Sequence, residues 1–142
     1  EKLIIADSRR GLQSYPNLTY KMNANELAAW KGCSKMSIDQ VKTESFQMAR
    51  KSGQPVFVSM ADQGITGVIP KGDQAHAASL PLRGPIDIVG AGDSVTANLC
   101  ASLAAGASLD EALQLSMRAA SCVIHQLGTT GTATRRDLLQ FA

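Results

Sequence analysis

The stretch Asp87-Ile88-Val89-Gly90-Ala91-Gly92-Asp93 puts a carboxylate where a helix is expected to begin, because residues 94–105 that follow are small and largely apolar. Its two glycines allow a tight turn that leaves backbone N–H groups open to a ligand. The first turn of a helix adds unpaired N–H donors and a partial positive charge, which suit a phosphate or a developing oxyanion. Asp93 is then placed to accept a proton from an attacking hydroxyl. Phosphoryl transfer needs this combination of groups.

The same stretch resembles the Asp-Thr-x-Gly-Ala-Gly-Asp signature of the PfkB/ribokinase-like carbohydrate kinases. Residues 106–112 are similar to the family's next turn and helix start, and residues 119–120 and 127–129 to the following helix and its exit. Within the family, residues 103–109 and 127–129 look most like the heptose-7-phosphate kinase branch. The resemblance implies an α/β fold, a three-layer ribokinase-like sandwich. It covers nearly all of this chain and only the second half of the family's members.

Composition narrows the class of protein. With 142 residues, 44% hydrophobic and 18% charged, the chain is long enough for a domain with a real core. A net charge of +2 without a Lys/Arg cluster, and 4% aromatic residues, argue against nucleic acid as a partner. Cys33, Cys100 and Cys122 show no metal or disulfide spacing, which fits a reducing cytoplasm. No segment has the signature of a signal peptide or a membrane span, so no membrane partner is expected.

Strand and helix signals alternate along the chain, as in an α/β layered fold. Strands are expected at residues 3–6, 18–22 and 55–60, and a hairpin at 64–69 and 75–80. Helices are expected from Asn23 to near Gly32, from Ser37 to Gly53, after Asp93, from Ser108, and after Thr134. Capping-box pairs mark several of these starts, for example Ser37 with Gln40 and Ser108 with Glu111. Residues 128–134 are loop-like.

Asp93 has two interpretations. Taken alone, an acid at this place is more often a cap or a first-turn acid than a catalytic base. The preceding glycines and the family resemblance reverse that preference. The resemblance implies that Asp93 deprotonates the sugar hydroxyl that attacks the γ-phosphate of ATP. The backbone at Gly90, Ala91 and Gly92 would stabilise the charge of the transferring group.

Asn23 and Glu26 form the second candidate pair. Their spacing fits a capping box and a functional motif about equally well. The family carries an Asn-x-x-Glu motif at this place, after a strand, which organises Mg²⁺ and its waters near the phosphates. Magnesium fits such a sparse ligand set because it keeps several waters and needs few direct carboxylates. Met22 replaces a proline that is common in the family, which alters the stiffness of the turn.

Three further positions are candidates. Ser59 and Gly64 lie in a stretch that resembles the family's Thr-Leu-Gly-x-x-Gly turn near the nucleotide phosphates, although a plain β-turn is about equally expected. Ala61 replaces a common glycine there. Asp87 matches an aspartate that binds a monovalent cation such as K⁺ in some members, or it caps a turn. Met117 stands where many members have an adenine-facing Asn and is read as core packing.

These observations predict an ATP- and Mg²⁺-dependent kinase that phosphorylates a hydroxyl of a small-molecule sugar or sugar phosphate. Residues 1–142 are expected to be one domain, the C-terminal nucleotide-binding and catalytic portion, without the sugar-binding half. On that basis the chain alone should bind nucleotide weakly and turn over little sugar. The oligomeric state is left open, with a homodimer as the candidate assembly.

Two other interpretations of the sequence are weighed against the kinase prediction. A non-catalytic remnant or interaction module would keep the fold without the reaction, as the altered Ile88-Val89, Ala61 and Met117 would allow. A dinucleotide-binding domain would use Gly90-Ala91-Gly92 as the start of a Gly-x-Gly-x-x-Gly fingerprint. Val95 occupies the third glycine position and no acid follows at the required distance, so the second rival is discounted. His76, His125 and the loop arginines are read as surface or partly packed residues.

Overall fold

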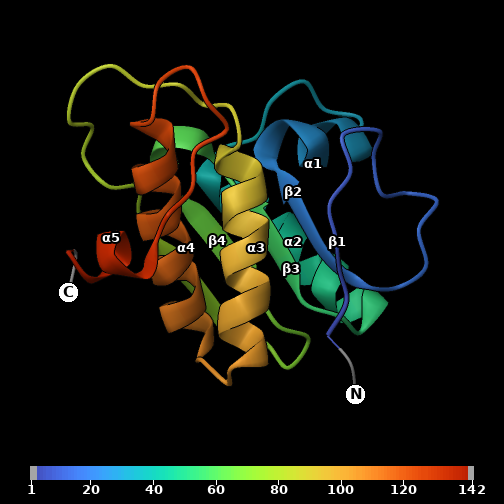
Figure 1. Ribbon diagram of the computed structural model, residues 1–142. Coiled ribbons are helices and arrows are strands. Elements are labelled where there is room, and N and C mark those ends of the chain that lie inside the picture. The colour runs from blue at the N-terminus through green and yellow to red at the C-terminus, as the bar shows by residue number, and fades with distance from the viewer. Residues whose placement is uncertain (1–2, 141–142) are drawn as a thin grey trace. The chain divides into compact units, whose positions relative to one another are not determined.

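The computed structural model describes residues 3–140 of the chain. The chain divides into two compact units, Glu1–His76 and Ala77–Ala142. The first unit carries a β-sheet with two helices, and the second carries three helices and the loops that join them (Figure 1).

The sheet of the first unit is mixed. Its strands are β1 (Ile5–Ala6), β2 (Thr19–Asn23), β3 (Val56–Ser59), β4 (Ile65–Val68) and β5 (Gln74–Ala77), and they lie in the order β1-β2-β3-β4-β5. The first three strands are parallel, and β4 is antiparallel to β3. Only residues 69–73 join β4 to β5, which is too short for a parallel crossover and therefore makes a hairpin. The hairpin that the sequence predicts is confirmed, and its turn is closed by a 3.0 Å bond from Ile69 N–H to Asp73 O.

Two helices of the first unit begin where their capping residues predict. Helix α1 (Ala24–Trp30) starts at the N-cap Asn23, and α2 (Ile38–Ser52) starts at the N-cap Ser37. Both starts are complete capping boxes, in which the side chain and the backbone of two residues bond reciprocally. Helix α2 ends at Gly53 with a φ of 69°, the left-handed conformation that favours glycine after a helix.

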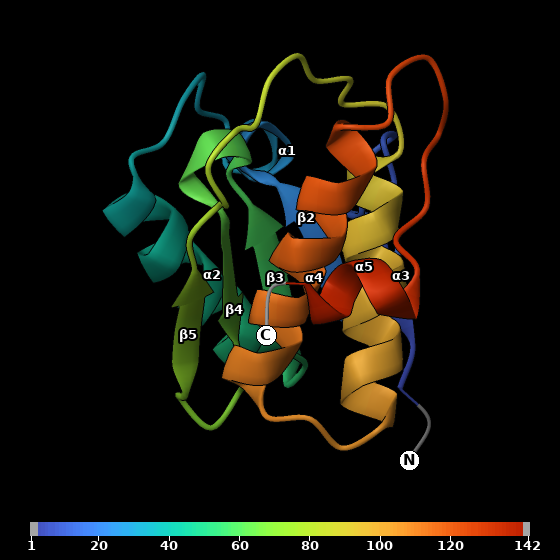
Figure 2. The ribbon, with the colours of Figure 1, turned by 60° about the vertical axis from the view of Figure 1, so that its left-hand side comes forward.

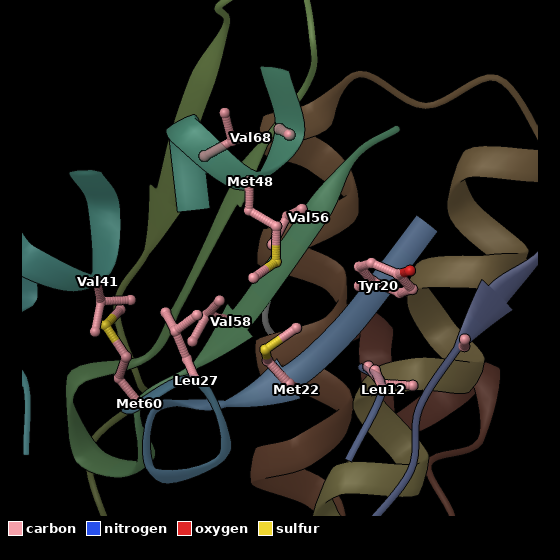
Figure 3. Packing of buried hydrophobic residues seen from close by; sticks show 12 residues of the cluster. Leu12, Tyr20, Met22, Leu27, Val41, Met48, Val56, Val58, Met60 and Val68 are labelled. Carbon is pink, nitrogen blue, oxygen red and sulfur yellow. The ribbon is translucent and has the colours of Figure 1, made fainter. Parts of the chain in front are cut away.

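One face of the sheet packs against α1 and α2 to form the core of this unit. Successive residues of a strand point to opposite faces, so Tyr20 and Met22 of β2 lie on this face together with alternate residues of β3. Figure 3 shows Leu27 of α1 in the same cluster of buried side chains. The cluster consists of Ala6, Leu12, Tyr20, Met22, Leu27, Val41, Met48, Ala49, Val56, Val58, Met60 and Val68.

The opposite face of the sheet carries a buried ion pair. Lys21, in the middle of β2, is 4% exposed, and its Nζ lies 2.9 Å from Oδ2 of Asp7, just beyond the end of β1. A buried ammonium requires such a partner, because leaving it unpaired costs several kcal/mol in general. The pair therefore links the two neighbouring parallel strands near their carboxyl ends.

The second unit is built around two long helices. Helices α3 (Ala91–Ala104) and α4 (Leu109–Ile124) lie side by side and are joined by the short turn at residues 105–108 (Figures 1 and 2). Helix α4 starts at Ser108, and the short α5 (Arg135–Leu139) starts at Thr134, each with the expected capping box. Within residues 3–140, no helix combines the length and the apolar character that crossing a membrane requires.

Three local expectations need correction. The predicted strand at residues 3–6 is shorter, because Leu3 and Ile4 are exposed and only Ile5–Ala6 pair with β2. The second hairpin strand ends at Ala77 rather than at residue 80. The turn expected between residues 59 and 64 contains a short 3₁₀ helix, η1 (Ala61–Gln63), which was not predicted.

Candidate functional site

The N-terminus of α3 has the tight glycine turn that the sequence predicts. Gly90 is its N-cap, with a φ of 82° that an L-residue with a side chain rarely adopts. Ala91 N–H donates to Ile88 O at 3.2 Å, and Ser94 N–H donates to Gly90 O at 2.9 Å. Within residues 3–140, the N–H groups of Gly92 and Asp93 have no acceptor. Because both residues are exposed, these two donors are open to an anion.

Gly90 is fixed by the loop that follows α4. A Cβ atom at position 90 would lie 2.6 Å from Thr130 O and 2.8 Å from Thr130 Cγ2, which is closer than real Cβ atoms approach. Glycine is therefore required here for two separate reasons, its left-handed backbone and the proximity of Thr130.

Gln126 holds that loop in place. Its Nε2 donates to Thr132 O at 2.6 Å, and its Oε1 accepts from Thr132 N–H at 3.0 Å. The same Nε2 also donates to Cys122 O at 3.3 Å, so the side chain ties the loop back to the last turn of α4. The loop expected at residues 128–134 is thus an ordered one, closed by a single amide side chain.

Asp93 occupies the third position of α3 and is not its cap. Among the described residues, its carboxylate has no hydrogen-bond or ion-pair partner, and the residue is exposed. The first-turn position favours a negative charge through the helix dipole. A carboxylate without an intramolecular partner, beside two open amides, is able to accept a proton from a bound hydroxyl.

Asp87 organises the loop in front of α3. Its Oδ1 accepts from Val89 N–H at 3.0 Å, its Oδ2 accepts from Gly128 N–H at 3.2 Å, and its own N–H donates to Ile124 O at 2.8 Å. The turn-capping role that the sequence left open is therefore present. Ile88, which stands at the threonine position of the signature, and Val89 are 74% and 56% exposed.

A second group of predicted residues lies in the first unit, at the carboxyl ends of β2 and β3. Asn23 and Ser59 are direct neighbours across these two strands. Asn23 Oδ1 accepts from Glu26 N–H at 2.9 Å, and one oxygen of Glu26, Oε2, accepts from Asn23 N–H at 2.7 Å. The second oxygen of Glu26, Oε1, accepts no hydrogen bond from the described residues. The capping box therefore fixes the pair and still leaves one carboxylate oxygen for a ligand.

The turn after Ser59 carries unusual backbone conformations. Ala61 is the non-glycine residue with a positive φ in the described part of the chain, at 52°. Gly64 has a φ of 86° and a ψ of −139°, a region that is essentially restricted to glycine. Met60 N–H donates to Gly64 O at 2.7 Å and closes the turn. Ala61 thus adopts a left-handed conformation, which glycine would take at a lower steric cost.

Other predicted residues have structural roles. Met117 is buried in α4, as core packing predicts. Residues 3–140 contain no cluster of three or more His, Cys, Asp or Glu side chains arranged to hold a metal ion. Burial raises the pKa of the Cys100 thiol, and burial followed by the Asp137 charge raises that of Cys122. A raised pKa disfavours the thiolate, which is the nucleophilic form of cysteine.

Sequence reasoning missed Thr130 and Gln126, which support the α3 turn, and the pairing of Lys21 with Asp7. Thr130 lies far in sequence from Gly90, and Lys21 lies far from Asp7, so no local motif marks these contacts. Gln126 bonds to Cys122 and Thr132, four and six residues away, but at spacings that belong to no capping or turn motif. For Lys21 there was a weak signal, because a lysine inside an apolar strand needs a counter-charge.

Comparison with known proteins identifies the family. A model of the pfkB family carbohydrate kinases matches residues 8–135. The chain belongs to this family. The bifunctional protein HldE of Bradyrhizobium sp. (strain ORS 278) is 36% identical over 92 residues, which cover 63% of this chain and 19% of that protein. This similarity agrees with the resemblance to the heptose-7-phosphate kinase branch.

Two solved structures show the same fold. Arabidopsis thaliana ribokinase, complexed with ribose and ATP, matches with a TM-score of 0.85 at 23% identity, over 97% of this chain and 46% of its own. Escherichia coli phosphofructokinase-2, in complex with potassium, matches with a TM-score of 0.77 at 26% identity, over 88% of this chain and 40% of its own. The α/β, ribokinase-like fold is confirmed. This chain spans less than half the length of each of these proteins.

Proposed function

We propose that this chain carries the nucleotide-binding and catalytic residues of an ATP-dependent kinase acting on a hydroxyl of a sugar or sugar phosphate. The observation that supports the proposal best is the turn at Gly90–Asp93, where two open amides adjoin a carboxylate that has no partner within residues 3–140. Family membership supports the general class of reaction.

Each residue of this turn has a proposed role. Asp93 accepts the proton of the attacking hydroxyl, which makes the oxygen a better nucleophile. The N–H groups of Gly92 and Asp93 donate to the oxygens of the phosphoryl group in transfer and stabilise its charge. Gly90 and Ala91 set the direction of these donors, since the backbone turns at Gly90 and Ala91 N–H is used by Ile88 O.

Asn23 and Glu26 are proposed to hold Mg²⁺, mainly through its waters. The free oxygen of Glu26 and the rigid capping box fit this ion, which needs few direct carboxylates and resists losing its waters. When bound, Mg²⁺ neutralises charge on phosphate oxygens. Ser59, at the end of β3, and Gly64, just before β4, are proposed to contact the nucleotide through the hydroxyl and the backbone. Asp87 is proposed to support a monovalent cation such as K⁺, in addition to organising its loop.

This chain covers less than half the length of each of the proteins compared above, and this supports a further part of the proposal. We propose that the sugar is recognised mostly by segments outside these residues, so that the 142-residue chain alone turns over little substrate. The sugar itself and the oligomeric state stay open, and the reaction is proposed to be cytoplasmic. A coupled kinase assay on the chain alone that showed normal turnover would refute this part.

The catalytic assignment is tested by Asp93→Asn in a full-length protein that contains this chain. Loss of a general base is expected to lower kcat by about 10²- to 10⁴-fold. Asp39→Asn is the matched control, because Asp39 is also an exposed first-turn acid, in α2, and loses the same dipole interaction without the glycine turn. Unchanged kcat in Asp93→Asn would contradict the assignment. Complete inactivity of the unmodified protein toward sugars and ATP would instead favour the non-catalytic module.

The magnesium assignment is tested by Glu26→Gln. Glutamine preserves the capping box but removes the charge, so the Mg²⁺ concentration for half-maximal activity should rise while the fold is retained. Glu111→Gln is the control, since Glu111 occupies the same place in the capping box of α4. An equal response of both variants would contradict the role of Glu26.

A further inference from the structure

Among the described residues, hydrogen bonds tie the loop in front of α3, residues 78–90, to the end of α4 and to the residues that follow it. Arg83 N–H donates to His125 Nε2 at 3.0 Å, Asp87 N–H donates to Ile124 O at 2.8 Å, and Gly128 N–H donates to Asp87 Oδ2 at 3.2 Å. The first of these anchors depends on an imidazole, which is the side chain that most readily changes protonation near neutral pH.

Its hydrogen bonds fix the protonation state of His125. A backbone N–H can only donate, so the bond from Arg83 requires a lone pair on Nε2. A carbonyl oxygen can only accept, so the 2.6 Å contact between Nδ1 and Ser121 O requires a proton on Nδ1. Only the neutral Nδ1–H tautomer satisfies both contacts. The imidazolium would keep the bond to Ser121 and lose the bond from Arg83.

We infer that His125 is a positioning residue for the phosphate-binding turn, because its neutral Nδ1–H tautomer anchors the loop that leads through Asp87 to Gly90. The inference rests on the proposed function of that turn. His125 is half-buried at the C-cap of α4, where its ring spans the last helical turn and the loop. Protonation of the ring removes the hydrogen bond from Arg83 N–H, while the two hydrogen bonds made by Asp87 stay in place. Binding of the anion at Gly92 and Asp93 is then weakened.

Charged and titratable groups surround this anchor on several elements. Cys122 lies one turn earlier on α4, Arg83 and Asp87 lie in the anchored loop, and Asp137 of α5 interacts electrostatically with Cys122. A change of pH can also alter the charge of some of these groups. The test must therefore measure the protonation of the His125 ring directly.

His76 is an internal control with the opposite chemistry. Its Nε2 lies 2.8 Å from Gln63 O, so Nε2 must carry the proton. Protonation of His76 leaves this hydrogen bond intact. The chain has two histidines, and they are expected to differ both in tautomer and in the consequence of acidification.

The first test is independent of kinase activity. Long-range ¹H–¹⁵N NMR correlations should show His125 protonated at Nδ1 and His76 at Nε2 near neutral pH. Amide exchange at Arg83 should accelerate severalfold once the His125 ring is protonated, relative to the change at Gly128 N–H, whose acceptor is Asp87. An Nε2–H tautomer at His125, or exchange at Arg83 that is the same for the neutral and the protonated ring, would overturn the inference.

The second test uses kinetics of a full-length protein that contains this chain. His125→Leu, which removes the acceptor, should raise the KM for ATP by about tenfold at neutral pH. His125→Gln restores an acceptor and should return the KM to within about twofold, while losing the acid-dependent rise that the unmodified protein shows. No rescue by glutamine, or an acid-dependent rise that persists in it, would overturn the inference. Absence of any kinase activity would overturn the proposed function and leave the NMR result as the test of the anchor.

Discussion

Replacing Gly90 with alanine tests the packing that shapes the α3 turn. Left-handed backbone costs an L-residue about 1–2 kcal/mol, and forcing a methyl group into a filled site costs about 1–3 kcal/mol. Part of this cost, about 0.4–1 kcal/mol, is offset because alanine lowers the conformational entropy of the unfolded chain relative to glycine. The free energy of unfolding should therefore fall by about 2–4 kcal/mol, which corresponds to roughly 5–15 °C in Tm. The contact at 2.6 Å with Thr130 O is the larger contributor.

Gly106→Ala separates the two contributions. Gly106 has a φ of 85°, close to the 82° of Gly90, and a Cβ there would meet nothing within 4 Å. The control should lose only about 1 kcal/mol, from the backbone alone. Urea denaturation followed by circular dichroism measures both variants. Equal losses would show that Thr130 does not confine position 90 and would refute the reasoning.

Three further predictions concern stability. Ala61→Gly should raise the free energy of unfolding by about 1 kcal/mol, because it relieves the left-handed φ of 52°; a loss in chemical denaturation would contradict this conformation. Ser102→Ala should also gain about 1 kcal/mol, because the buried Ser102 hydroxyl finds no hydrogen-bond partner in the described part of the chain. Ser116→Ala is its control and should not gain, since that hydroxyl donates to Ala112 O at 2.7 Å. The hydrogen bonds from the Ser108 side chain and backbone lower the pKa of Glu111, so their contribution is present above the unfolded-state pKa and is lost as the pH falls. Glu111→Gln should therefore show a smaller drop in unfolding free energy between about pH 7 and pH 3, and an identical drop would count against it.

Much of the fold could be predicted from local sequence. The helix starts at Asn23, Ser37, Ser108 and Thr134 are all as expected, because a capping box involves residues only three apart. The parallel strand at β3 was equally clear, since its continuous apolar run is typical of a strand buried on both faces. The glycine turn before α3 could be predicted because Gly90 marks it locally, whereas the contact with Thr130 that confines Gly90 could not.

Contacts between distant segments could not be predicted. Residues 3–4 are as apolar as a strand but lie outside the paired part of β1, and only the observed pairing with β2 shows this. His125 was read as a partly packed residue, which is correct for its burial, although its two partners could not be inferred. The local pattern around Asn23 and Glu26 suited a cap and a ligand equally, and the structure contains the cap. Whether the same pair also binds Mg²⁺ stays a prediction.

Gln126 gives the chain a chemical point of vulnerability. Its side-chain amide copies the pairing that a neighbouring strand would offer to Thr132, with nitrogen toward a carbonyl and oxygen toward an N–H. Hydrolysis of that amide to a carboxylate would change neither the size nor the shape of the side chain. It would, however, place a carboxylate oxygen 2.6 Å from Thr132 O, where the amide now donates a hydrogen bond. Repulsion between the two oxygens would release the loop whose residue Thr130 packs against Gly90. Slow deamidation of Gln126 would thus disturb the turn at Gly90–Asp93 without changing any residue of the turn itself.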